Sequence, residues 1–312
     1  MDALTHGLIG LAIGNLSGQP LSYNNPIYLA AFFGSLAPDL DIVAISRGGM
    51  SYLKQHRSAS HSFVGIVGWA SLIALLVHWI SVEVSFMTLW CWAFLGAFSH
   101  IIMDYFNTHG AALFWPLCHQ RLSANLINVF DPLLFLVLVV SYGINLPVPL
   151  SVSSFAGVTV YLLFRYILRN RAERQLRKHF SSLSVKRLLL MPSLRSVTCW
   201  DFVMETESQY YVGKIGIYYS IPTIYAILPI QLYSPIIEQA QDTLLGKFFS
   251  LFTPFLYFAE QGQPGSKKVQ VYDLRYFEKN SFLHSGIIIY DDDNQLCESY
   301  VESYGCKLKF PA

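Results

Sequence analysis

The stretch HRSASHSFVGIVGWASLIALLVHWI (residues 56–80) joins a polar segment that contains two histidines to a long apolar run. The run from Ser62 to Ile80 holds 19 residues and no Asp, Glu, Lys or Arg. A helix needs about 20 such residues to cross the hydrocarbon core of a bilayer. The stretch therefore predicts a transmembrane helix with His56 and His61 at its entrance.

The composition of the whole chain also indicates a membrane protein. Of its 312 residues, 53% are hydrophobic and 13% are charged, whereas a soluble domain is about 25% charged. The net charge of +1 gives no reason to expect a nucleic-acid partner. The five cysteines form no CxxC pair, so neither a disulfide framework nor a zinc ribbon is indicated. The first residues lack a basic region and a small-residue cleavage site, so we expect no cleavable signal peptide.

Further apolar runs predict an α-helical membrane bundle of about 4–6 apolar helices. Such a run can also be a buried core helix, but four long runs in so short a segment favour the membrane. The remaining long candidates are Val84–Met103, Phe130–Leu146 and Val152–Leu168, and the shorter runs are Leu4–Leu16 and Ile27–Ala37.

The distribution of basic residues predicts the orientation of the bundle. A basic block from Arg165 to Lys178 follows the last candidate span directly, which is typical of the cytoplasmic side. Counting back through alternating spans places residues 39–61 and 104–129 on that side as well, and the opposite turns contain no Lys or Arg. We therefore expect a multi-pass protein of a bacterial inner membrane with both termini in the cytoplasm.

The sequence changes character after the basic block. We expect a membrane-embedded region at residues 1–168, a basic juxtamembrane linker at 169–181, and a small α+β, β-rich cytoplasmic domain at 182–312. This last domain is a possible binding surface for a protein partner. Its strands are expected at residues 197–205, 210–219, 269–277 and 282–290, and an amphipathic helix at 236–259, on the membrane surface.

Histidines and acids lie at the cytoplasmic ends of these apolar segments. His100 and Asp104 are four residues apart on one predicted helix, and this spacing puts both on the same face. Neither a DxD turn nor one His on an apolar helix is specific alone, but here several segments each bring such a group to one level. The groups that we expect to form the metal site are His6, Asp39, Asp41, His56, His61, His100 and Asp104.

Four imidazoles and three carboxylates suit Zn²⁺, Mn²⁺ or Fe²⁺ and contain too much nitrogen for a Ca²⁺ site. Seven groups are more than the four ligands of one tetrahedral site. Either some of them hydrogen-bond the ligands instead of binding the metal, or two metals lie about 3.5–4 Å apart. Arg57 is placed to stabilise an anion, and Asp41 or Asp39 can act as a general base if it is not a ligand. His109 is a spare candidate ligand, and Asp131 either caps a helix or closes the site.

The order of these motifs resembles that of the YdjM-like family of bacterial inner-membrane proteins, described as metal-dependent hydrolases. The resemblance covers roughly residues 1–140, with Ser58 and Ser60 where the family usually has Gly and Thr. A distant similarity of the family to zinc-dependent phospholipase C and P1-type nucleases implies phosphoester hydrolysis. The tail, with Trp200 and residues 271–276, resembles the C-terminal part of longer members. The shared motifs are Asp2 with Thr5-His6, Pro38-Asp39 with Asp41, His56-Arg57 with His61-Ser62, His100 with Asp104, Gly110, Trp115-Pro116 and Asp131-Pro132.

Two functions follow as hypotheses. The first is a metal-dependent hydrolase at the cytoplasmic membrane face, with a phospholipid or another small amphiphilic phosphoester as substrate and one or two Zn²⁺ or Mn²⁺ ions. The second is a non-catalytic scaffold or regulator in which the metal is structural and residues 182–312 bind a partner. A transporter is less favoured, since its ionisable groups would lie at mid-membrane rather than at one edge.

Overall fold

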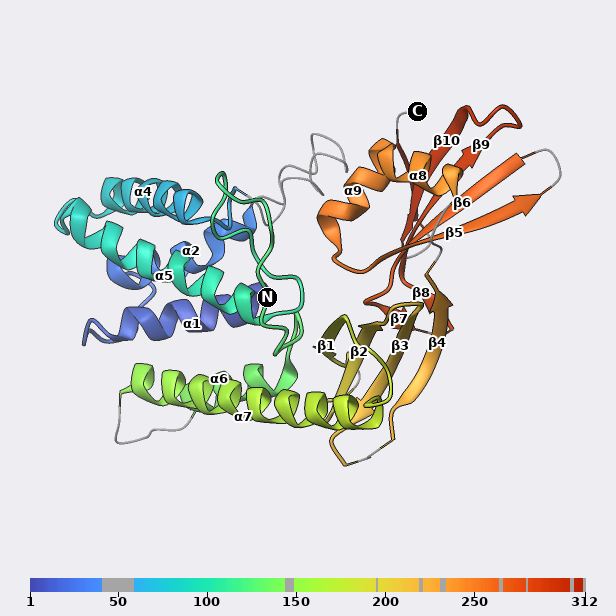
Figure 1. The fold of residues 1–312 in the computed structure, drawn as a ribbon. Helices are drawn as coiled ribbons and strands as arrows, with labels where there is room; N and C mark the ends of the chain where they lie inside the picture. Colours follow the sequence, from blue (N-terminus) through green and yellow to red (C-terminus); the bar gives the residue numbers. More distant parts are fainter. Residues whose placement is uncertain are drawn as a thin grey trace. The chain divides into compact units, whose positions relative to one another are not determined.

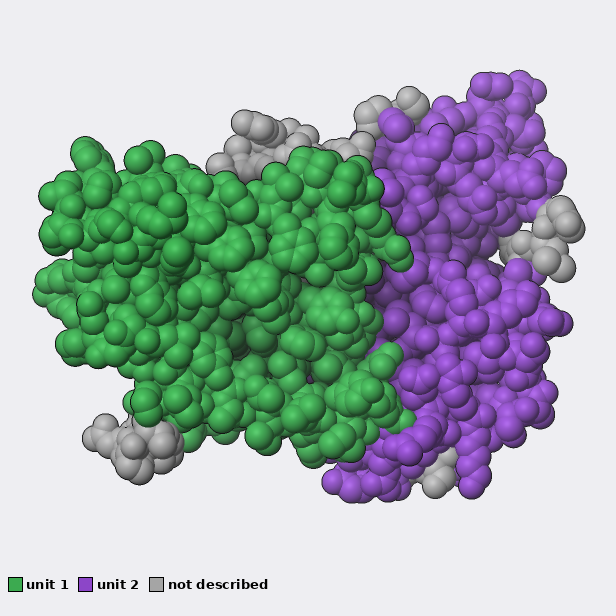
Figure 2. All heavy atoms as spheres, turned by 60° about the vertical axis from the view of Figure 1, so that its left-hand side comes forward, with its two compact units in different colours: residues 1–170 green, residues 171–312 purple. Residues whose placement is uncertain are grey.

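The computed structural model describes residues 1–40, 59–143, 149–194, 196–218, 221–230, 234–263, 266–278, 280–303 and 306–310. The chain divides into two compact units, Met1–Asn170 and Arg171–Ala312, which Figure 2 colours separately. The division falls inside the long helix α7 (Leu150–His179). Most of the expected basic linker therefore continues this helix.

The first unit is a bundle of helices (Figure 1). Among the described residues, three helices are long and apolar enough to cross a membrane: α4 (Phe63–Ile80), α5 (Phe86–Phe106) and α7. These helices confirm the predicted membrane bundle. Of the span expected at residues 130–146, the structure describes helix α6 (Pro132–Gly143), which has 12 residues, and the end of the expected span lies outside the described residues. Two further short helices in the described part of this unit are α1 (Ala3–Asn15) and α2 (Pro26–Leu36).

Polar side chains set where these helices begin. The Asp2 carboxylate accepts a hydrogen bond from the backbone N–H of Thr5 at 2.9 Å and so caps α1. The Ser62 hydroxyl accepts one from the N–H of Gly65 at 3.0 Å and caps α4. Such caps satisfy donors that the first turn of a helix leaves unpaired. The cap at Ser62 fixes the preceding residue, His61, at the entrance of α4.

Small residues let α2 and α5 approach each other closely. A Cβ atom added at Gly34 of α2 would collide with the backbone carbonyl of Ala93, and one added at Gly96 of α5 would collide with that of Ala31. Glycine and alanine at such contacts are typical of helix packing in membranes, where backbones meet without bulky side chains between them. This contact places the C-terminal half of α2 beside the middle of α5, one turn before His100.

The second unit contains an antiparallel four-stranded sheet, a five-stranded sheet, a strand pair and two helices (Figure 1). The β-rich α+β domain predicted from the sequence is therefore confirmed. The four-stranded sheet is ordered β1 (Arg187–Pro192), β2 (Cys199–Glu205), β3 (Gln209–Gly216) and β4 (Thr223–Pro229). The five-stranded sheet is ordered β11 (Cys306–Phe310), β10 (Leu296–Ser303), β9 (His284–Tyr290), β6 (Ser266–Asp273) and β5 (Leu256–Gln263), and the pair is β7 (Phe277–Glu278) with β8 (Ser281–Phe282).

The helix expected at residues 236–259 is wrong in its extent. It consists of α8 (Pro235–Asp242) and α9 (Leu244–Phe252), and residues from Leu256 onward belong to strand β5. Thr243 ends α8 and caps α9, because its hydroxyl accepts a hydrogen bond from the N–H of Gly246 at 3.0 Å. Pairing of Leu256 with Asp273 then holds the following residues in the sheet.

The close packing of α2 and α5 predicts that Gly96→Ala destabilises the protein. The added methyl group meets the Ala31 carbonyl, and overpacking of this kind costs about 1–3 kcal/mol. Gly68→Ala on α4 is the matched control, because an added Cβ there meets nothing within 4 Å. Thermal unfolding in detergent should show a lower apparent Tm for Gly96→Ala alone. Equal shifts for both variants would contradict the packing.

Candidate metal centre

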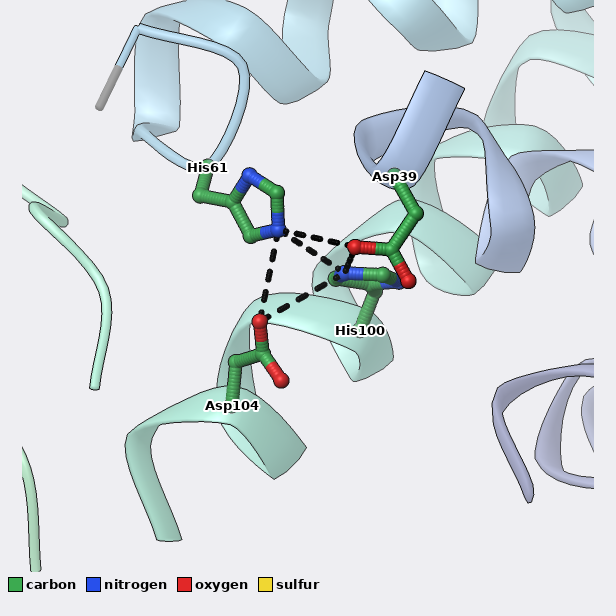
Figure 3. Close-up of side chains that lie close together, drawn as sticks. All are labelled: Asp39, His61, His100 and Asp104. Atoms are coloured by element: carbon green, nitrogen blue, oxygen red, sulfur yellow. Dashed lines mark hydrogen bonds and ion pairs between the residues drawn. The ribbon is translucent and has the colours of Figure 1, made fainter. Parts of the chain in front are cut away.

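Four side chains from three separate segments meet in the first unit (Figure 3). Asp39 lies just after α2, His61 lies just before α4, and His100 and Asp104 lie one turn apart on α5. One candidate ligand atom from each residue lies within 4.8 Å of the other three. His61, His100 and Asp104 are completely buried, whereas the Asp39 side chain is 24% exposed.

The spacing of these atoms can be compared with that around a metal. Nε2 of His61 lies 3.2 Å from Nε2 of His100, 3.3 Å from Oδ1 of Asp39 and 3.3 Å from Oδ2 of Asp104. Nε2 of His100 lies 3.5 Å from Asp39 and 3.7 Å from Asp104. A tetrahedron with metal–ligand bonds of about 2.0–2.1 Å has edges of about 3.3–3.4 Å. The four groups are therefore spaced so that they could hold a metal ion.

The hydrogen bond behind His100 sets the state of its ring. Nδ1 lies 2.7 Å from the backbone carbonyl oxygen of Ser35. A carbonyl oxygen only accepts, so Nδ1 carries the hydrogen and donates it. In the neutral ring, Nε2 then presents its lone pair to the cluster, which is the form that binds metal. The Nδ1 atom of His61 is similarly engaged, at 2.9 Å from the Ser60 hydroxyl.

Asp104 is held from the side opposite the two imidazoles. Its Oδ1 accepts a hydrogen bond from the Asn107 amide at 2.7 Å and also contacts the α-amino group of Met1. The side-chain Oδ1 of Asn107 in turn accepts hydrogen bonds from the backbone N–H groups of His109 and Gly110. These partners leave Oδ2 directed at His61 and His100. Asn107 was not among the residues expected at the site, although it lies three residues after Asp104, a spacing that brings two side chains together at the end of a helix.

The ionisation state of Asp39 suits this residue to bind a metal ion. Burial acts to raise the pKa of this carboxyl, but contacts with the imidazoles of His100 and His61 outweigh that effect and hold the pKa well below its usual range. Asp39 is therefore ionised at neutral pH. Metal ligands must be deprotonated, and an ionised carboxylate meets that requirement.

His6 lies next to the four-residue cluster rather than within it. Its ring stacks on that of His100 at a centroid distance of 3.7 Å, and its Nε2 is 3.6 Å from Oδ1 of Asp104. The ring is buried, and neither nitrogen makes a hydrogen bond within the described part of the chain. His6 therefore packs against the imidazole of His100 and remains a candidate ligand.

The other expected site residues divide into two groups. Asp41, His56 and Arg57 lie outside the described residues, so their roles stay predictions. Asp131 caps α6, because its Oδ1 accepts hydrogen bonds from the Leu134 N–H at 3.2 Å and the Tyr161 hydroxyl at 2.7 Å. His109 is not a member of the four-residue cluster, and its Nδ1 faces the Thr108 hydroxyl at 3.3 Å.

This geometry predicts the effect of removing single ligands on metal content. His61→Ala and Asp104→Ala should each lose most of the metal. Removing a residue that only hydrogen-bonds a ligand costs about 10–100-fold in metal affinity, and removing the ligand itself costs more. His78→Ala is the matched control, since His78 lies at the other end of α4 and bonds the Val84 carbonyl. Mass spectrometry of metals in detergent-purified protein measures the result. Equal metal content in all three variants would contradict the site.

Both halves of the chain match known protein families. Residues 235–306 match the YfhP C-terminal alpha/beta plait domain. The chain is 24% identical over 311 residues to "Uncharacterized protein YfhP" of Bacillus subtilis (strain 168), covering 96% of this chain and 94% of that protein. No solved structure matches. Residues 1–172, more than half of the chain, match the YdjM inner membrane protein family, as their motifs suggested, and the chain belongs to that family.

Proposed function

We propose that this protein is a metal-dependent hydrolase that cleaves a phosphoester at the cytoplasmic face of the inner membrane. One observation carries the proposal. Two imidazole nitrogens and two carboxylate oxygens converge at the separations of a tetrahedral metal site, within a unit that contains membrane-spanning helices. Zn²⁺ and Mn²⁺ both suit this donor set.

The burial of the four side chains suggests which of them bind the metal and which acts as a general base. His61, His100 and Asp104 are fully buried and would hold the metal. A divalent metal held in this way supplies Lewis-acid chemistry, which makes water a nucleophile near neutral pH. Asp39 is the most exposed of the four, so its carboxylate is the one placed to accept a proton from an attacking water as general base. Three protein ligands with one open position are typical of catalytic zinc sites.

Two residues outside the described part complete the proposed chemistry. Arg57 precedes His61 by four residues, so its guanidinium can reach an anionic phosphoryl group and stabilise the charge that develops there. Asp41 is the alternative general base if Asp39 ligates the metal. A second metal ion would need Asp41, His56 or His6 as additional ligands, because Oδ1 of Asp104 already accepts from Asn107.

The distribution of charge supports the proposed location. The basic segment at the end of α7 (Arg177, Lys178 and His179) favours the cytoplasmic side for this helix end. Both chain termini lie on that side if the shorter helices α1, α2 and α6 cross the membrane in alternation with α4, α5 and α7. His100 and Asp104 lie in the last two turns of α5. The site would then lie at the depth of lipid head groups, where an amphiphilic phosphoester is available. The β-rich second unit would be cytoplasmic and free to bind a protein partner.

A structural metal is the second candidate, and one observation favours it. Four protein ligands saturate a tetrahedral site, and saturated sites are usually structural. In that case all four residues would hold the metal, no open position would remain, and the protein would act as a membrane scaffold. The two candidates differ in the expected role of Asp39.

The proposal predicts different effects for two isosteric substitutions. Asp39→Asn should keep most of the metal but lower kcat by about 10²–10⁴-fold, the usual contribution of a general base. Asp104→Asn should lose metal and activity together, because the buried amide cannot replace an ionised ligand. Activity is measured on bis-p-nitrophenyl phosphate and on phospholipid vesicles with Zn²⁺ or Mn²⁺, beside metal content.

His78→Ala serves as the control and should match the wild type in both measurements. The hydrolase proposal fails if the metal-loaded wild type cleaves neither substrate. Loss of metal from Asp39→Asn together with a lowered apparent Tm would instead support the structural site.

A further inference from the structure

An apolar groove runs along the first unit beside the candidate metal centre. It has a volume of about 500 Å³ and lies between α5 and α7, with Ile9 of α1 and Leu126 completing its wall. Met103 and Val158 form part of its buried floor. Leu163 and Tyr166 lie at its rim and are 56% and 52% exposed, so the groove opens on the outer surface of the bundle.

The groove and the metal centre share helix α5, and α1 contributes a residue to the groove and the neighbouring His6. On α5, Met103 lines the groove and directly precedes Asp104, and Ser99 lines it and directly precedes His100. On α1, Ile9 lies three residues after His6, which places both on one side of that helix. The groove therefore extends along the neighbouring face of the same turns of α5 that carry the two ligands.

Length and surroundings identify what can fill this groove. The lining residues of α7 extend from Phe155 to Tyr166, which corresponds to about 16 Å at 1.5 Å per residue. One leaflet of a bilayer has about 15 Å of hydrocarbon, half of the usual thickness. Both helices that form the groove are membrane-spanning candidates, so its open side faces lipid rather than water. An acyl chain matches the length, the apolar lining and the direction of access.

The lining of the groove is mostly apolar, and its polar side chains are Ser99, Thr159 and Tyr166. Tyr166 is at the end of the groove nearest the basic end of α7, and tyrosine is typical of the boundary between acyl chains and head groups. From Tyr166 the lining continues along α7 to Phe155, away from that boundary, and Thr159 is its one hydroxyl side chain there. Arg165 donates a hydrogen bond to the Leu126 carbonyl, and the Leu126 N–H donates one to the Phe106 carbonyl at the end of α5. A lipid bound with its head group near Tyr166 would thus have its phosphoester at the end of α5 that carries Asp104.

We propose that this groove binds one acyl chain of a membrane lipid and thereby presents the head-group phosphoester of that lipid to the metal centre. The assignment of this lipid as substrate rests on the proposed hydrolase function, whereas acyl-chain binding itself does not. The substrate class is accordingly a long-chain phospholipid rather than a soluble phosphoester.

A photoactivatable phosphatidylglycerol with a diazirine on its acyl chain tests the groove. The full-length protein is reconstituted in vesicles that contain this lipid, illuminated and digested, and the labelled peptides are identified by mass spectrometry. We expect labelling of residues 99–106 and 155–166 well above that of α4, whose outer face exposes Leu72 and Leu75. Equal labelling of the three helices would overturn the proposal, since it would indicate only random lipid contact.

A substitution that fills the groove provides the second arm. Leu163→Trp should lower groove labelling about tenfold, as expected if the indole excludes about two methylene groups. Leu72→Trp on α4 is the matched control and should leave the labelling unchanged. Unchanged labelling in both variants would also overturn acyl-chain binding.

Hydrolysis assays distinguish a failure of the groove proposal from a failure of the proposed hydrolase function. Leu163→Trp should reduce cleavage of long-chain phospholipid and leave cleavage of bis-p-nitrophenyl phosphate and metal content unchanged. If the groove is labelled specifically but no substrate is cleaved, acyl-chain binding stands and the hydrolase function fails. If both substrates are cleaved equally by both variants, the hydrolase function stands and the groove has no role in presenting substrate.

Discussion

The close approach of α2 and α5 is the contact on which the metal centre depends. Gly34 and Gly96 let the two backbones meet, and the same approach brings the Ser35 carbonyl within 2.7 Å of the His100 ring. That hydrogen bond orients the imidazole and leaves Nε2 directed at Asp39, which follows α2. Larger residues at the two glycines would separate the helices and move both the ligand and the group that orients it.

Burial makes this arrangement costly without a cation. Asp104 is fully buried, and ionised groups within a membrane protein need a partner. Asn107 and the α-amino group of Met1 satisfy one carboxylate oxygen, and the other faces the two imidazoles at 3.3 and 3.7 Å. A divalent metal between these groups would compensate the remaining charge. The same binding energy would stabilise the folded bundle, so a catalytic and a stabilising effect of the metal are compatible.

Short-range sequence patterns predicted much of the fold and the identity of the clustered side chains. The i,i+4 spacing placed His100 and Asp104 on one face of α5, and an uninterrupted apolar run predicted α4. Contacts between distant segments were not predictable in the same way, because no local pattern encodes that Ser35 supports His100. The helix expected across residues 236–259 failed for this reason too, since pairing of Leu256 with Asp273 outweighs local helix preference.

X-ray absorption spectroscopy at the metal edge, on full-length protein purified in detergent without chelators, tests the metal centre most directly. The structure predicts four to five nitrogen and oxygen neighbours at about 2.0–2.1 Å, with the outer-shell scattering of two imidazoles and no sulfur. Absence of bound metal, a sulfur neighbour at about 2.3 Å, or a shell without imidazole scattering would contradict the site built from Asp39, His61, His100 and Asp104.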